Sequence, residues 1–245
     1  MNVKLNCDLG ESYGNWSIGN DEAVMPFIDQ ANIACGFHAG DPMVMTKTIQ
    51  LAKQHNVEVG AHPSYPDLNG FGRRSMQCSR DELISLVRYQ VAAIDGVAKS
   101  LDVELSYVKP HGALYNDMMK SDSVRESLMD AVSGYHRPLK LMLQATPLYE
   151  IHKEEAEKAG VSLLFEAFAD RCYTDEGLLV KRGEKGAVHS SQLMLEQAQL
   201  LATEKQVITQ TGKRISVAAD SLCVHGDNQE SIDSVKQIKH ILANI

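Results

Sequence analysis

Four histidines of this sequence each stand at the end of a short apolar segment, or a few residues past it. His38 follows NIACGF, His62 follows VEVGA, His111 follows YVKP and His225 follows SLCV. A single loop histidine usually serves a turn or a structural hydrogen bond, but the same placement four times indicates a shared site. Imidazoles transfer protons near neutral pH and donate hydrogen bonds to developing negative charge. We therefore expect acid–base chemistry at these positions.

Carboxylates occupy similar places. Asp8 and Glu11 stand at the end of the apolar segment 3–9, where Asp8 is a candidate base towards water and Glu11 a candidate substrate-binding group. In the alternative interpretation, Asp8 caps a turn at Gly10 and Glu11 is solvated. A second charged group at the end of segment 162–168 consists of Glu166, Asp170 and Arg171.

Cations complete the set of candidate residues. Lys109 stands two residues before His111, and Pro110 fixes the backbone between them. Arg73 and Arg74 are adjacent in a loop rich in Gly and Pro, and a guanidinium group suits a carboxylate or a phosphate. The alternatives are that Lys109 pairs with a carboxylate of a neighbouring strand and that both arginines are solvated.

Parallel strands are the elements that would bring these side chains together. The apolar segments that begin at residues 30 and 57 flank a helix that Asp41 caps and Pro42 begins, which is a βαβ unit. Strands joined in this way are parallel, so His38 and His62 emerge at one rim of the sheet.

The same alternation of strand and helix continues along the chain. Further strands are expected at 3–9, 105–108, 139–143, 162–168, around 207 and at 215–224. The expected helices are 21–29, a long helix from a capping box at Ser79 and Glu82, 123–133, 147–159, 190–203, and a last helix capped by Asp227 with Glu230. Seven or eight strands in a single domain, residues 1–245, favour a TIM-like β/α barrel, in which functional groups lie at the carboxyl ends of the strands. An open sheet is the alternative.

Composition sets the broad class. The 245 residues include 24 basic and 32 acidic side chains, and the net charge of −8 argues against nucleic acid or an anionic membrane as partner. The five cysteines show no metal-binding spacing and read as free thiols of a reducing compartment. With no signal segment and no membrane-spanning run, we expect a cytoplasmic protein.

Six segments, LNCDLGES, NIACGFHAGDP, VGAHPSYPD with GFGRR, YVKPHGALYN, EAFADRCY and VHGDN, in this order resemble the LamB/YcsF family over nearly the whole chain. Its members are assigned as the A subunit of a bacterial ATP-dependent 5-oxoprolinase. The resemblance implies a barrel related to carbohydrate deacetylases, hydrolysis of 5-oxoproline to L-glutamate coupled to ATP, and work with the partner B and C subunits.

The residues can be assigned to that chemistry as a hypothesis. Lys109 with Arg73 or Arg74 would hold the substrate carboxylate or a phosphoryl group, Asp8 or His111 would act as base, and the other histidines would donate to negative charge. His62 is counted with the catalytic residues. The substrate-binding set is Glu11, His38, Arg73, Arg74, Glu166, Asp170, Arg171 and His225.

Three points stay open in the sequence. No Walker A segment occurs, so ATP binds at an unfamiliar site or in a partner subunit. A metal-dependent, deacetylase-like amide hydrolase is one alternative, with a divalent metal on Asp8, His38, His62 and His225. A non-catalytic subunit that binds the lactam is the other.

Overall fold

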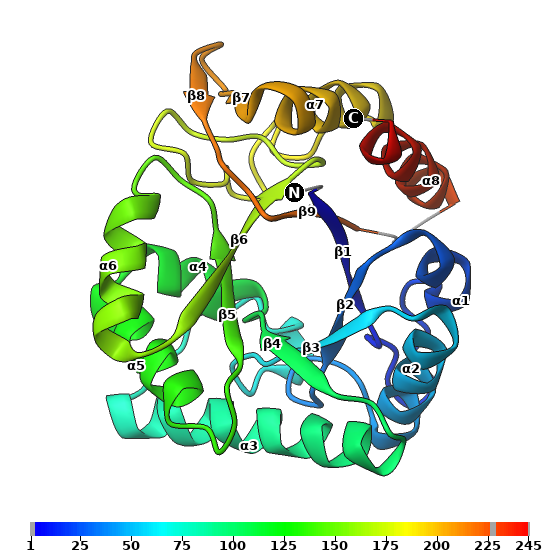
Figure 1. Ribbon diagram of the computed structural model, residues 1–245, viewed down its shortest axis with the longest axis vertical. Coiled ribbons are helices and arrows are strands. Elements are labelled where there is room, and N and C mark those ends of the chain that lie inside the picture. The colour runs from blue at the N-terminus through cyan, green and yellow to red at the C-terminus, as the bar shows by residue number, and fades with distance from the viewer. Residues whose placement is uncertain (1–2, 226–228, 245) are drawn as a thin grey trace.

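Seven parallel strands form a closed barrel in the computed structural model (Figure 1), which describes residues 3–225 and 229–244. Around the ring they are ordered β1-β2-β3-β4-β5-β6-β9, so the last strand closes the barrel between β6 and β1. The strands are β1 (Lys4–Leu9), β2 (Gln30–Ala34), β3 (Glu58–His62), β4 (Leu105–Val108), β5 (Lys140–Gln144), β6 (Ser162–Phe168) and β9 (Ser221–Val224). The expected β/α barrel is confirmed.

Helices surround this ring (Figure 1). The α-helices are α1 (Asp21–Val24), α2 (Pro42–His55), α3 (Arg80–Ser100), α4 (Gly112–Lys120), α5 (Asp122–Ser133), α6 (Tyr149–Ala159), α7 (Ser191–Glu204) and α8 (Gln229–Ala243). Two 3-10 helices are η1 (Met25–Phe27) and η2 (Leu68–Gly70). The expected helix starts at Asp41 with Pro42 and at the Ser79–Glu82 capping box are both present.

Side chains alternate along each strand, so one set faces the helices and the other faces the barrel interior. The outward set includes Leu5, Ile33 and Val59, which belong to the apolar core together with the inner faces of the helices. The inward set includes the polar side chains of Asn6, Asp8 and Asn32. The strand register places Asp8 beside Asn32, Asn32 beside Gly60, and Gly60 beside Tyr107. This layer of the interior is therefore built from four strands distant in sequence.

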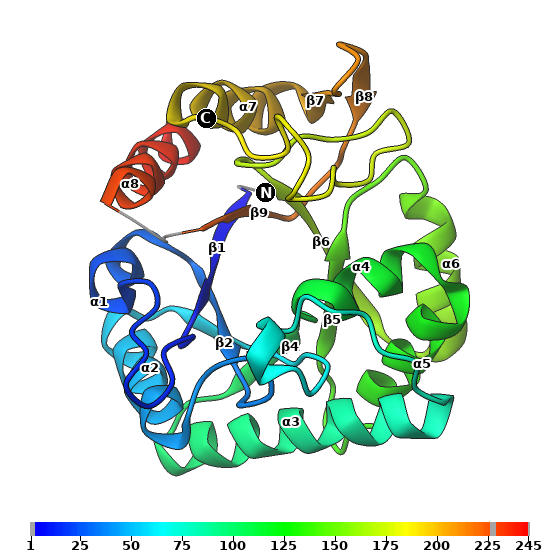
Figure 2. The same cartoon turned by 180° about the vertical axis from the view of Figure 1, so that it is seen from behind.

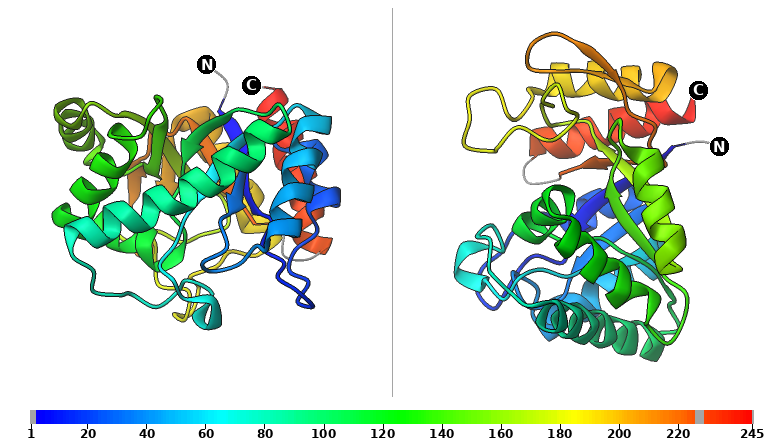
Figure 3. Two further views of the ribbon diagram at one scale, coloured as in Figure 1. Left: turned by 90° about the horizontal axis from the view of Figure 1, so that it is seen from below. Right: turned by 90° about the vertical axis from the view of Figure 1, so that its left-hand side faces the viewer.

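The loops that follow the strands lie at one end of the barrel. In the left view of Figure 3, η2 and the segment drawn in yellow lie on the side opposite the marked chain ends. The same segments lie over the ring of strands in Figure 2, at the end that carries the carboxyl ends of the strands. The groups expected at strand ends therefore share one face.

Three expected elements differ from the structure, and one helix is additional. The segment 215–224 is two strands, because β8 (Arg214–Ser216) pairs antiparallel with β7 (Gln206–Ile208) before the chain enters the barrel as β9. The turn between them is held by Asp220, which accepts from the Phe165 backbone N–H. The helix expected at 147 begins at Tyr149, and 21–29 divides into α1 and η1. Helix α4 was not expected.

Two further expectations concern the cysteines and the last helix. All five cysteines are free, and Cys7, Cys35 and Cys223 are buried. The capping residue Asp227 lies outside the residues that the structure describes, as do the side-chain contacts of Glu230. Among the described residues, no helix is long and apolar enough to span a bilayer.

Candidate active site

A cavity of about 340 Å³ opens at the carboxyl ends of the strands. Asp8, Glu11 and His62 lie in its wall beside Lys109 and His111. The basic lining residues are Arg73, Lys109, Lys120, Arg171, Lys181 and Arg182. Among the lining residues that the structure describes, these six cations stand against two carboxylates, those of Asp8 and Glu11. The cavity is therefore strongly cationic in a protein whose net charge is −8.

Lys109 lies at the base of this cavity and is only 2% exposed. Its Nζ lies 2.9 Å from Asp8 Oδ1 and 3.0 Å from Glu166 Oε2. Burial lowers the pKa of Lys109, but Asp8, Cys223 and Glu166 raise it, and the result is well above the usual value. Burial raises the pKa of Asp8, but His62 and Lys109 lower it well below the usual value. The pair is therefore an ammonium and a carboxylate.

A chain of amide side chains supports Asp8 from below. Asn32 Nδ2 donates to Asp8 Oδ1 at 2.8 Å and to Asn6 Oδ1 at 2.8 Å. Tyr107 donates its hydroxyl to Asn32 Oδ1 at 2.7 Å, and Asn6 donates to Ser221 at 2.7 Å. Each of these buried polar groups has a partner, so the network fixes the direction of the Asp8 carboxylate.

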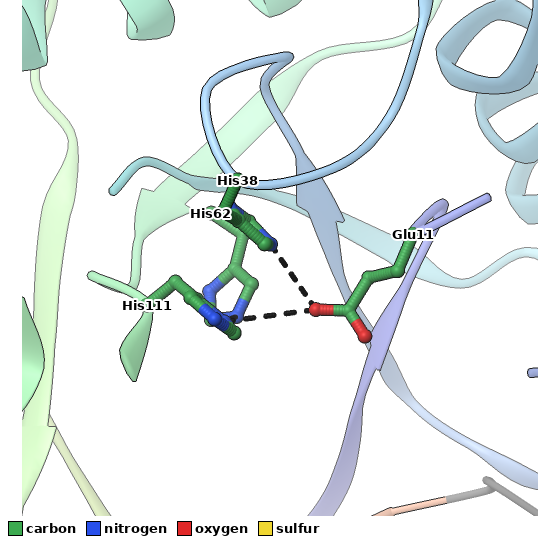
Figure 4. Close-up of side chains that lie close together, drawn as sticks. All are labelled: Glu11, His38, His62 and His111. Carbon is green, nitrogen blue, oxygen red and sulfur yellow. Dashed lines mark hydrogen bonds and ion pairs between the residues drawn. The ribbon is translucent and has the colours of Figure 1, made fainter. Parts of the chain in front are cut away.

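His38, His62, His111 and Glu11 form a compact cluster at the same end of the barrel (Figure 4). The rings of His38 and His111 stack at 3.7 Å, and His38 Nε2 lies 3.1 Å from Glu11 Oε1. Burial lowers the pKa of both His38 and His111 well below 6.5, and burial raises the pKa of Glu11. Both rings are therefore neutral imidazoles at neutral pH.

Backbone carbonyls orient two of these rings. His62 Nδ1 donates to the Lys109 carbonyl at 2.7 Å, and His111 Nε2 donates to the Phe71 carbonyl at 2.9 Å. Gly72 allows the second contact, because a Cβ there would lie 2.7 Å from His111 Cδ2 and 2.9 Å from His38 Cβ. The GFGRR loop is thus a support for the histidines as well as a source of arginines.

The two adjacent arginines of that loop have different surroundings. Arg73 lines the cavity, and its guanidinium carbon lies 5.0 Å from the centre of the Phe71 ring. Arg74 is absent from the lining and forms an ion pair with Asp67, whose carboxylate also accepts from the Gly70 N–H. The hypothesis of a ligand-binding arginine is therefore narrowed to Arg73, and Arg74 closes the turn instead.

His225 and Asp170 form a second pair on the opposite wall. His225 Nδ1 donates to Asp170 Oδ2 at 2.6 Å, and its Nε2 lies 3.0 Å from Arg182 Nη2 and 3.7 Å from Asp8 Oδ2. Burial lowers the pKa of His225, but Asp170 raises it above 6.5 overall. Burial raises the pKa of Asp170, but His225 lowers it below its usual value. A ring held by a carboxylate and facing a cavity has the geometry of a general acid or base.

The remaining residues from the expected substrate-binding set have supporting positions. Glu166 is fully buried behind Lys109, and His38 lies behind His111. Arg171 lines the cavity, but its guanidinium group donates to the carbonyls of Val180 and Ala187 and so holds the loop between β6 and α7. These residues position others and do not all face a ligand.

The four expected metal ligands lie in two separate groups. His38 and His62 join Glu11 and His111, whereas Asp8 and His225 lie in a separate group with Cys223. The four residues Asp8, His38, His62 and His225 therefore do not come together as one group in the part of the chain that the structure describes. Distance in sequence gave no indication of which strand ends would be neighbours.

Three lining cations were missed in the sequence, namely Lys120, Lys181 and Arg182. Arg182 contacts His225 from an exposed loop, and Lys120 comes, together with Tyr115, from the unexpected helix α4. The apolar spacing of Ala113, Leu114 and Met118 could have indicated the helix.

Comparisons with known proteins agree with this arrangement. The profile of the LamB/YcsF family matches residues 3–245. A protein of Vibrio campbellii, named as the A subunit of 5-oxoprolinase, is 52% identical over 241 residues, covering 98% of this chain and 95% of the relative. A protein of Pseudomonas putida, named as a second such A subunit, is 50% identical over 239 residues, covering 97% and 93%. The crystal structure of a lactam utilization protein from Thermus thermophilus aligns with a TM-score of 0.90 and 36% identity, covering 100% of this chain and 97% of that one.

Proposed function

Since this chain belongs to the LamB/YcsF family, we propose that it is the A subunit of a 5-oxoprolinase that hydrolyses 5-oxo-L-proline to L-glutamate at the expense of ATP. In this proposal the chain binds the lactam and works with the partner B and C subunits. The names of its relatives support 5-oxoproline as the substrate. The cationic side chains of the cavity suit the negative charge of this substrate.

The single observation that carries the proposal is the cationic cavity at the strand ends. 5-Oxoproline is a carboxylate, and ATP delivers a phosphoryl group with further negative charge. Six lysines and arginines around about 340 Å³ suit an anion of this size, and a cavity of this volume falls within the usual range for small ligands.

Ring opening of a five-membered lactam breaks an unstrained, resonance-stabilised C–N bond. Transfer of a phosphoryl group from ATP to the amide oxygen makes the carbonyl carbon more electrophilic. Water then adds to that carbon, and the C–N bond breaks as the ring nitrogen takes up a proton, which leaves an acyl phosphate. A second water molecule hydrolyses the acyl phosphate to L-glutamate and phosphate. The protein has to orient the substrate, remove a proton from water and protonate the nitrogen.

The geometry suggests which residues serve these steps. Arg73 and Arg182 bind the substrate carboxylate or the phosphoryl group from the cavity wall. Asp8 accepts the proton of water, and Lys109 keeps Asp8 ionised. His225, held by Asp170, transfers the proton to nitrogen. His62 and His111 line the cavity, but their N–H groups donate to backbone carbonyls, so they do not donate to the substrate.

The decisive experiment compares glutamate formation from 5-oxoproline and ATP by this chain alone, by the B and C subunits alone, and by all three together. We expect turnover only in the complete set, with one ADP formed for each glutamate. Glutamate formation at the same rate when this chain is left out would refute the proposal. Binding of an ATP analogue to the isolated chain, measured by calorimetry, tells whether the nucleotide site lies here or in a partner.

A non-catalytic role, in which the chain presents the lactam to its partners, is the second candidate. It is favoured by the observation that Lys109 and Asp8 already neutralise each other. Under this function Asp8→Asn leaves kcat of the complete enzyme within a few-fold of wild type, while calorimetry still detects 5-oxoproline on the chain.

A further inference from the structure

The contact between His62 and His111 cannot be an ordinary neutral hydrogen bond. His62 Nδ1 carries a hydrogen, because it donates to the Lys109 carbonyl. His111 Nε2 carries a hydrogen, because it donates to the Phe71 carbonyl. A neutral imidazole has one hydrogen on its two nitrogens, so the inner nitrogens, His62 Nε2 and His111 Nδ1, both present lone pairs. They nevertheless lie 3.0 Å apart.

Two lone pairs at this distance repel unless positive charge lies between them or beside them. An added proton or a metal cation can supply it. The surroundings favour a cation, because Glu11 Oε1 lies 3.6 Å from His111 Nδ1 and 3.1 Å from His38 Nε2. Three imidazoles and one carboxylate thus converge from four separate segments (Figure 4), and their ligand atoms all lie within 4.8 Å of one another.

Three of the six distances between the ligand atoms fit a tetrahedral coordination geometry. In a tetrahedral zinc site with bonds of about 2.0–2.1 Å, ligand atoms lie about 3.3 Å apart. In this cluster, His62 Nε2 lies 3.0 Å from His111 Nδ1. Glu11 Oε1 lies 3.1 Å from His38 Nε2 and 3.6 Å from His111 Nδ1, so the three distances fall on both sides of that value. A metal-bound histidine commonly donates the N–H of its other ring nitrogen to a backbone carbonyl. His62 and His111 each donate such an N–H to a backbone carbonyl here.

Burial adds a further observation. His38 is 1% exposed, and its Nδ1 has no hydrogen-bond partner among the described residues. Its Nε2, which lies 3.1 Å from Glu11 Oε1, is therefore the ring nitrogen that points into the cluster.

We propose that Glu11, His38, His62 and His111 form a binding site for one divalent transition-metal ion of the zinc type. Imidazole nitrogens with one carboxylate suit such ions better than Mg²⁺ or Ca²⁺, which prefer oxygen ligands. The site adjoins the cationic cavity, because Glu11, His62 and His111 also line it. There the ion would polarise a bound oxygen atom. The proposal does not rest on the identity of the substrate.

The test uses the metal alone. The full chain is stripped with chelator, titrated with ZnCl₂ by calorimetry, and analysed for metal after gel filtration. We expect one Zn²⁺ per chain and a higher melting temperature with Zn²⁺. Glu11→Gln and His62→Gln should weaken binding at least about 100-fold, the upper end of what loss of a hydrogen-bond partner behind a ligand costs. Glu11→Gln keeps size and shape, so it decides the question if the histidine variant fails to fold.

Two control variants locate the ion. His136→Gln alters a surface histidine that is 68% exposed and should bind Zn²⁺ as wild type does. Cys223→Ser alters the neighbouring group of Asp8, Cys223 and His225 and should also retain binding. Loss of binding in Cys223→Ser, or wild-type binding in Glu11→Gln, would overturn the assignment. So would a wild-type Kd weaker than about 0.1 mM, which would indicate that a proton occupies the site.

Discussion

Lys109 Nζ lies 2.9 Å from Asp8 Oδ1, although the two residues are 101 positions apart in sequence. Glu166 completes the ion triad on the far side of the ammonium group. Removing a buried charge leaves its partners uncompensated, whereas removing an exposed one changes little. We therefore expect the triad to contribute to the stability of the fold.

The first prediction concerns this triad. Lys109→Met leaves Asp8 and Glu166 without a counter-charge and should lower the free energy of unfolding by about 3–5 kcal/mol, measured with denaturant. The double variant with Glu166→Gln should regain part of the loss. Lys4→Met is the control, since its ion pair with Glu58 is nearly half exposed and should contribute less than about 1 kcal/mol. A cost for Lys109→Met as small as that of the control contradicts the prediction.

The second prediction separates the adjacent arginines. Arg73→Ala removes a cation that lines the cavity and should raise KM for 5-oxoproline, or for ATP, about 10-fold or more in the complete enzyme. Arg74→Ala removes only the ion pair with Asp67, from a side chain that is 65% exposed. Its KM values should stay within about 2-fold of wild type. Equal effects of the two substitutions would show that the loop, and not the Arg73 guanidinium group, is responsible.

The third prediction concerns proton transfer by His225. His225→Gln should lower kcat about 10²–10⁴-fold with little change in KM, because general acid–base groups act in the transition state. Asp170→Asn keeps the ring but weakens its orientation and should have a smaller effect in the same direction. His136→Gln, at the surface, should not change kcat. A rise in KM without loss of kcat would make His225 a binding residue.

The fourth prediction is the pH dependence of stability in the same pair. Because the pKa of His225 is raised in the folded protein, its protonated ring stabilises the fold. This stabilisation is complete below the unfolded-state pKa of about 6.5 and is lost as pH rises through the folded-state pKa. Because the pKa of Asp170 is lowered in the folded protein, its carboxylate stabilises the fold above the unfolded-state pKa of about 3.9. This stabilisation is lost as pH falls through the folded-state pKa of Asp170. His225→Gln should therefore destabilise most between about pH 4 and 6.5 and less at pH 9. Denaturant unfolding across this range measures it, and a cost independent of pH contradicts it.

The fifth prediction tests the barrel interior. At Gly60 an added Cβ would lie 2.2 Å from the Tyr107 ring, which is fully buried and hydrogen bonded to Asn32. Gly60→Ala should therefore cost at least about 2 kcal/mol. Gly96→Ala lies in α3 with no atom within 4 Å and should stabilise by about 0.5–1 kcal/mol. Equal melting temperatures for the two variants would contradict the packing described for Tyr107.

Much of the barrel could be predicted because its strands are short apolar segments with clear helix caps between them. Strand alternation also places Asp8, Lys109 and His225 on the inward set. The break at 217–220 could not be predicted, since Asp220 turns the chain through a contact with Phe165 of another strand. Local apolar character is the same on both sides of that turn.

The directions of individual side chains could not be predicted from the sequence, for a similar reason. Arg73 and Arg74 have the same chemistry, and only the contact of Arg74 with Asp67 separates them. His111 was expected as a base, but the Phe71 carbonyl holds one of its nitrogens and directs the other at His62. These contacts join segments distant along the chain, and spacing in the sequence does not encode them.

The closing position of β9 between β6 and β1 has a consequence for synthesis of the protein. A nascent chain that has left the ribosome only through β6 already contains Asp8, Lys109 and Glu166, but it lacks the strand that joins the two open edges of the sheet. Its interior polar groups then face water through that gap. The ring of strands around the cavity is complete only after the C-terminal segment has been translated, so we expect truncated products that lack β9 not to form this cavity.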